Sequence, residues 1–337
     1  MTELPERPDL AQLRRRAKEL HRAAAEGDPE GLRRLRAVSD QTTLGAAQLA
    51  VAREHGFPSW PSLRAAVEAR RTNVVSALMP DKYRQAPVYG ARDFLKWART
   101  QGWSAGPLPV GGVFTSQTFI TSHLEAHPER YVLSDSLSPT NARVFMTAAS
   151  PSVAIACLGV GAPAVVTLLE NLVGLGVRSF IAVGPAPAVS PDLRWGDCVV
   201  LDRALRDDGI SHHYVAPARY ADADGVLTNR LLKEADTEGL KPRIGSAWTV
   251  PTPYRTTAEE LAAYREEGVL VTDLSTAALF AVAAALGARA ASAVVATRSL
   301  GSRKPATAPA PERRTDQVLT LIGAAISALQ GEAQVPA

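Results

Sequence analysis

The chain has 337 residues, of which 46% are hydrophobic and 21% charged, and its formal net charge is +3. This composition is typical of a folded globular protein, and so small a positive surplus speaks against nucleic-acid binding, which needs a concentrated basic face. The sequence has no apolar stretch long enough to cross a membrane, its charged start does not resemble a signal peptide, and its two cysteines fit a reducing compartment. We therefore expect a cytoplasmic protein that is not bound to a membrane.

Residues 1–75 are predicted to form a small all-helical module. Stop signals such as Gly27-Asp28-Pro29 separate three or four short helices, and 13 Lys plus Arg face 10 Asp plus Glu in this stretch. In the first helix, apolar residues recur at helical spacing and are expected to face inward, while a run of basic residues covers the solvated side. The inward set is Leu10, Leu13, Ala17, Leu20 and Ala24.

The segment from Leu44 to Ala69 resembles the helical module at the front of many bacterial ankyrin-repeat-type proteins, although no ankyrin repeats follow it. Two interpretations stay open. The module either docks a protein partner or forms a structural cap on the domain that follows.

Proline and glycine are frequent between residues 76 and 110, where the sequence predicts a connector containing one short amphipathic helix. From residue 111 to 332, predicted strands and helices alternate regularly. This alternation favours a three-layer α/β domain with a mostly parallel or mixed central sheet. The strands are expected at 112–115, 131–134, 142–147, 153–158, 180–183, 198–204, 243–250, 269–273 and 291–297, with helices between them.

A strand, glycine turn, helix and second strand between Val153 and Val183 are the centre of this domain. Gly159 and Gly161 allow a sharp turn after the first strand, and another turn of small residues, which includes Gly184 and Pro185, is expected after the second. Ligands of such units bind at the carboxyl ends of the strands.

Several stretches in order resemble the nucleoside phosphorylase superfamily, which includes purine and uridine phosphorylases and nucleosidases. They are LGVGAPAVV, FIAVGPAPAV, WGDCVVLDRALRDDGISHHY and GSAWTVPTPYRTTAEELAAYREEGVLVTDLSTAALFAVAAALG. The resemblance implies a three-layer phosphorylase-like domain with a mixed central sheet, preceded here by the small all-helical domain. It also implies a nucleoside-like ligand and assembly as a homo-oligomer.

The same resemblance implies that the inherited site has changed. Where family members hold phosphate with an arginine, a hydroxyl and a glycine, this chain has Ala182, Pro185 and Pro187. The glutamate that binds ribose in the family is matched by Ser275, which is also a good helix N-cap. Arg298 stands where purine phosphorylases have an acid, and an arginine there suits a carbonyl oxygen.

Few polar residues remain as candidates for chemistry. The catalytic candidates are His212, His213, Arg298 and Asp273, since a histidine can serve as a general acid or base near neutral pH. Each histidine can equally well be a packed loop residue, and aromatic residues most often fill core. We expect neither a metal, because no ligand spacing occurs, nor any other cofactor. The substrate-binding candidates are Gly159, Gly161, Gly184, Pro185, Tyr214, Trp248, Tyr254, Arg255 and Ser275.

Three functional hypotheses follow from these residues. The first is a repurposed enzyme that acts on a planar or apolar small molecule, through acid–base catalysis or by shaping the substrate in a dry pocket. The second is a nucleosidase or pyrimidine-like nucleoside phosphorylase. The third is a non-catalytic small-molecule-binding or scaffold protein whose residues 1–75 recruit a protein partner.

Overall fold

The fold is taken from a computed structural model, which describes residues 9–64, 67, 81–115, 118–137, 142–301 and 311–333. The chain divides into two compact units, residues 1–80 and 81–337. Residues 1–8 and 68–75, at the two ends of the predicted helical module, lie outside the described residues. So do residues 76–80, the first of the predicted connector. No helix within the described ranges is long and apolar enough to cross a membrane.

The first unit is helical, as the sequence predicts. Its helices are α1 (Leu10–Ala25), α2 (Pro29–Arg36) and α3 (Leu44–Glu54), and a further helical segment begins at residue 60. All five residues expected on the inner face of α1 are buried. A side chain caps each start: the carboxylate of Asp28, for example, accepts a hydrogen bond of 2.7 Å from the Gly31 amide of α2. Helix ends and packing faces can therefore both be predicted from local sequence.

The second unit is built on a mixed sheet, which confirms the predicted α/β class. The strand order is β10-β6-β8-β9-β5-β1-β4-β3-β2; β7 pairs with β6, and β10 also pairs with β5. Strands β4, β1, β5 and β10 run parallel, whereas β3 and β6 are antiparallel to their neighbours β4 and β10. The strands are β1 (Gly112–Thr115), β2 (Tyr131–Leu133), β3 (Arg143–Thr147), β4 (Ala154–Cys157), β5 (Ser179–Ala188), β6 (Cys198–Arg206), β7 (Tyr220–Asp222), β8 (Arg243–Thr249), β9 (Val271–Asp273) and β10 (Arg289–Ser299).

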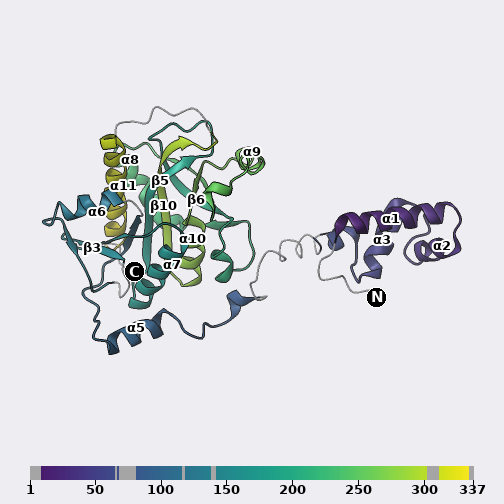
Figure 1. Ribbon diagram of the computed structural model, residues 1–337, viewed down its shortest axis with the longest axis horizontal. Coiled ribbons are helices and arrows are strands. Elements are labelled where there is room, and N and C mark those ends of the chain that lie inside the picture. Colours follow the sequence, from purple (N-terminus) through teal and green to yellow (C-terminus); the bar gives the residue numbers. More distant parts are fainter. Residues whose placement is uncertain are drawn as a thin grey trace. The chain divides into compact units, whose positions relative to one another are not determined.

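Helices cover both faces of this sheet and complete three layers (Figure 1). On one face α7 (Ala162–Leu175) and α10 (Thr276–Ala285) share a hydrophobic core with the sheet, and on the other face α6 (Thr118–Glu125), α8 (Gly225–Thr237) and α11 (Pro311–Ala333) share a second core. Helix α9 (Ala258–Glu266) contributes Leu261 to a smaller cluster around Trp248. Both sheet faces are thereby covered, as the apolar character of the strands requires.

Helix α5 (Ala91–Thr100) lies in the segment predicted as a connector. Its Leu95 is buried, and a methyl group placed on Gly174 of α7 would meet the Leu95 side chain at 2.9 Å. The helix is thus packed on α7, within the second unit. The helix is amphipathic, so its apolar face is stabilised by packing against another element.

Strand β5 is longer than predicted. The turn expected after Val183 does not form, and the strand continues through Gly184, Pro185 and Ala186 to Ala188. Parallel pairing with β10 supports this extension, with Gly184 opposite Val294 and Ala186 opposite Ala296. Small residues and proline locally indicate a turn, but the long partner strand keeps the backbone extended.

Candidate functional site

A pocket of about 330 Å³ opens at the carboxyl ends of the parallel strands. The ends of β1, β5, β9 and β10 and the turn that starts α7 supply most of its wall, so the predicted location of the site agrees with the geometry. Of the candidate residues, those that line this pocket are Gly159, Gly161, Gly184, Pro185, Tyr254, Asp273, Ser275 and Arg298.

The extension of β5 forms the middle of the wall. The last pair between β1 and β5 is Phe114 with Ala182, and β1 ends one residue later, at Thr115. Beyond Ala182, this edge of β5 has no β1 residue beside it and borders the pocket. Pro185 and Pro187 both lie along this open edge. Proline has no N–H and is tolerated where a strand lacks a neighbour. The prolines therefore take away two backbone donors that other residues would offer to a ligand here.

The glycine turn between β4 and α7 forms another side. Gly161 has a φ of 98°, a conformation that side chains other than glycine rarely adopt, and it is the N-cap of α7. No side chain caps this helix start, and Pro163 occupies one of its first positions. The helix dipole adds partial positive charge at this side of the pocket.

Asp273 is engaged in holding the start of α10. Its Oδ2 accepts hydrogen bonds from the backbone N–H groups of Ser275 (2.9 Å) and Thr276 (2.6 Å), and its Oδ1 accepts one from the Thr249 hydroxyl (2.6 Å). That hydroxyl accepts the next amide of the helix, from Ala277, at 2.9 Å. The carboxylate thus does the capping that the sequence suggested for Ser275, whose own side chain makes no capping bond.

Within the described ranges, Arg298 is the one positively charged residue of the pocket wall. It lies near the end of β10, after an irregularity in the pairing with β5, and its side chain is exposed. Among the described residues its guanidinium has no hydrogen-bond or ion-pair partner. A guanidinium that the protein leaves unpaired at a pocket is available to a carbonyl or an anion.

The two candidate histidines lie in a short 3-10 helix, η2 (Ser211–His213), and neither lines the pocket. His212 lies beside the buried Arg206, with 3.3 Å between its Nδ1 and the guanidinium. Arg206 also donates to the Ser211 hydroxyl at 2.9 Å. Burial lowers the pKa of His213, and the positive charge of Lys82 lowers it further. The Nδ1 atom of His213 lies 2.6 Å from Lys82 Nζ. These contacts favour a structural role for η2.

The remaining candidates are also placed outside the pocket wall, apart from Tyr254. Trp248 is fully buried and donates from Nε1 to the carboxylate of Asp207 at 3.0 Å. Tyr214 lies beside Glu170, and burial, reinforced by that carboxylate, raises the pKa of Tyr214 to about 12. Tyr254 belongs to the 3-10 helix η3 (Pro253–Arg255), where its ring is 99% exposed at the pocket mouth, whereas Arg255 does not line the pocket.

Sequence reasoning missed several hydroxyl-bearing residues of the wall. Two of them, Thr115 and Thr272, stand at or next to the end of a strand, but only the strand register shows which residues share one pocket. The hydroxyl of Thr115 is buried, and no described residue makes a hydrogen bond to it. The missed residues are Thr115, Thr256, Thr272, Thr276 and Ser292. The described ranges contain no cluster of side chains able to hold a metal ion, and we assign no cofactor.

A three-layer α/β domain with a pocket at the carboxyl ends of its parallel strands has the arrangement in which α/β proteins commonly bind small ligands. Sequence comparison makes this class more specific: the model of the phosphorylase superfamily matches residues 128–329, more than half of the chain. The chain belongs to the phosphorylase superfamily.

Curated relatives include nucleoside phosphorylases at low identity. Uridine phosphorylase of Haemophilus influenzae is 28% identical over 152 residues, 41% of this chain and 60% of that protein. Uridine phosphorylase of Thermococcus kodakarensis is 31% identical over 28% of this chain and 34% of its own length. The DeoD-type purine nucleoside phosphorylase of Caldanaerobacter subterraneus is 27% identical over 42% of this chain and 62% of its own length. The chain therefore matches less than two thirds of each of these relatives.

Proposed function

We propose that this phosphorylase-like protein is a repurposed enzyme that binds a planar, largely apolar small molecule, with a carbonyl or anionic group of the ligand against Arg298. One observation carries the proposal. Among the described residues, the wall contains an unpartnered guanidinium and a single carboxylate, Asp273, whose oxygens already accept hydrogen bonds from the start of α10 and from Thr249. The pocket therefore offers positive charge without a free counter-charge.

The chemistry available in such a pocket is electrostatic. Arg298 can stabilise negative charge that develops on a ligand oxygen, and the uncapped start of α7 supports the same sign. The apolar wall, which includes Val165, Val250 and Val294, excludes water and can hold the ligand in a reactive shape. Histidine acid–base catalysis has less support, because His212 and His213 are outside the wall.

Cleavage of an N-glycosidic bond is the second candidate. The uridine phosphorylases among the relatives favour it, and Arg298 would then face a base carbonyl. The loss of donors along β5, with prolines at 185 and 187, counts against a phosphate-dependent reaction. A non-catalytic binding protein is the third candidate. Assembly as a homo-oligomer and residence in the cytoplasm belong to the same proposal.

A two-part experiment separates these candidates. The full chain is first incubated with a panel of purine and pyrimidine nucleosides, with and without phosphate, and free base is measured. We expect no phosphate-dependent release, and such release would overturn our proposal in favour of a nucleoside phosphorylase. Release without phosphate would instead indicate a nucleosidase.

The second part measures thermal shifts with planar aromatic acids, planar ketones and matched compounds that lack the carbonyl group. A ligand at one hundred times its dissociation constant stabilises the protein by about 2.7 kcal/mol. Because a hydrogen bond to a charged group contributes about 1.5–3 kcal/mol, Arg298→Ala should weaken binding about 10- to 100-fold, and Arg298→Lys less. Arg255→Ala, an exposed neighbour outside the wall, is the matched control. Equal shifts with and without the carbonyl group would refute the role of Arg298.

A further inference from the structure

A groove in the first unit runs between the end of α2 and the second half of α3. It encloses about 630 Å³ and is lined by small and aliphatic side chains together with charged ones. We call the apolar lining residues its base and the charged lining residues its rim: the base consists of Ala37, Val38, Leu49 and Ala50, and the rim of Arg33, Arg34, Arg53 and Glu54. None of these residues has a role in the pocket of the second unit.

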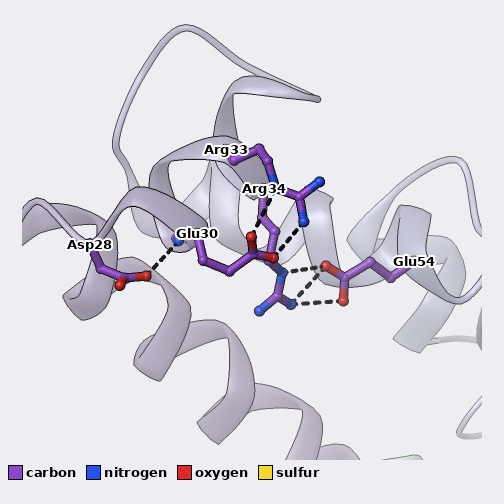
Figure 2. A network of polar contacts seen from close by, with 6 residues as sticks. Asp28, Glu30, Arg33, Arg34 and Glu54 are labelled. Atoms are coloured by element: carbon purple, nitrogen blue, oxygen red, sulfur yellow. Dashed lines mark hydrogen bonds and ion pairs between the residues drawn. The ribbon is translucent and has the colours of Figure 1, made fainter.

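The charges of the rim are unbalanced. Arg34 donates from Nε and Nη2 to the carboxylate of Glu54 at 2.7 and 2.9 Å, and Arg33 contacts Glu30 at 2.8 and 2.6 Å (Figure 2). The Arg33 and Glu30 side chains are 74% and 59% exposed, so this pair contributes little and can exchange with other charges. Arg53 is exposed and has no ion-pair partner among the described residues. With Glu30 counted, three guanidinium groups face two carboxylates, and the exposed Arg53 supplies the surplus positive charge.

We propose that this groove binds an acidic amphipathic helix of a partner protein. Such a helix would place apolar side chains, three or four positions apart, on the base formed by Val38 and Leu49, and carboxylates against Arg53 and Arg33. At 1.5 Å per residue, α2 is about 12 Å long, enough for about two turns of the partner. The proposal gives the helical module a defined surface and a defined partner chemistry.

Charge and shape make other occupants less suitable. In a symmetric contact between two copies, each basic rim would meet the same basic rim, which is unfavourable. A nucleic acid would gain nothing from the apolar base. An acidic amphipathic helix can instead pack apolar side chains on the base and pair carboxylates with the arginines of the rim.

The test uses three fluorescent synthetic peptides and the full chain. The first is a helix with leucine at i, i+3, i+4 and i+7 and glutamate on its polar face; the second has lysine for every glutamate; the third has glutamine for every leucine. Fluorescence anisotropy gives each affinity. We expect the first to bind about ten-fold more tightly than either of the others, since an exposed ion pair is worth up to about five-fold and several act together.

Variants locate the binding surface. Arg53→Gln should weaken the first peptide about two- to five-fold, and Arg53→Glu about ten-fold, because the second change adds repulsion. Arg15→Glu on the exposed side of α1 makes the same change in net charge and should have little effect. Circular dichroism melts confirm that each variant is folded. The proposal is overturned if the acidic and basic peptides bind equally, if Arg15→Glu weakens binding as much as Arg53→Glu, or if a DNA duplex competes as well as the acidic peptide.

Discussion

Asp273 provides the sharpest test of the structure, because the sequence makes it a catalytic candidate while its contacts indicate a capping role. Its two oxygens accept two backbone amides of α10 and the hydroxyl of Thr249. Replacement by alanine removes the acceptor for all three donors. The helix that then loses its cap is almost wholly buried.

The expected cost follows from these contacts. Loss of a helix N-cap destabilises a protein by about 1 kcal/mol, within a range of about 0.5–2 kcal/mol. The Thr249 hydroxyl, on a fully buried residue, loses its acceptor at a further cost of about 1–3 kcal/mol. Asp273→Ala should therefore lower the free energy of unfolding by about 3 kcal/mol. For a unit of this size that corresponds to a fall in Tm of about 6–12 °C.

Urea unfolding monitored by tryptophan fluorescence measures this loss, with Asp222→Ala as control, since Asp222 is an exposed carboxylate on β7. Asp273→Asn keeps one acceptor oxygen and should cost less, about 1–2 kcal/mol. An Asp273→Ala protein as stable as the wild type would refute the capping role. If that protein also lost ligand binding without losing stability, Asp273 would have to act on the ligand directly.

Three further predictions concern the second unit. A methyl group on Gly111 would lie 2.8 Å from the carbonyl oxygen of Ser179, so Gly111→Ala should destabilise the protein by about 1–3 kcal/mol in urea unfolding. Arg219 lowers the pKa of Glu267 to about 2, so the stability from this pair is complete above pH 4.5 and is lost as pH falls toward 2; Glu267→Gln should flatten acid unfolding curves in that window. Burial raises the pKa of Cys198 to about 12, so its thiol should react with a disulfide reagent at pH 8 only after unfolding.

Local sequence is sufficient to predict most helices and strands of the fold. It is insufficient for the end of strand β5, which forms part of the pocket wall. The strands are apolar runs between turn signals, and Asp28, directly before Pro29, marks the start of α2 by residue type alone. The predicted end of β5 is wrong because Gly184 and Pro185 are turn residues by local rules. Their strand conformation depends on the pairing with β10, more than one hundred positions along the chain, which no local pattern contains.

The candidate site shows the same division. Residues at strand ends, such as Gly159 and Arg298, are predictable because parallel strands bring their carboxyl ends together. His212 and Trp248 are candidates by residue type, but tertiary contacts decide their places: one lies beside the buried Arg206, and the other donates to Asp207 within a small core. Residue type predicts what a side chain can do, whereas register and burial decide whether it reaches the ligand.

Two features of the pocket wall, one on β5 and one at the start of α10, have the same consequence for the proposed ligand. Along β5, Pro185 and Pro187 present an edge without N–H donors, so a phosphate dianion, which needs several fixed donors, loses part of its cradle. At α10, Asp273 is bound to the helix start, so a sugar diol loses a carboxylate acceptor. Arg298 lines the same pocket, and one guanidinium suits one carbonyl or one carboxylate. Under our proposal we therefore expect a ligand with a single such group on an apolar frame to bind more tightly than a nucleoside with phosphate does.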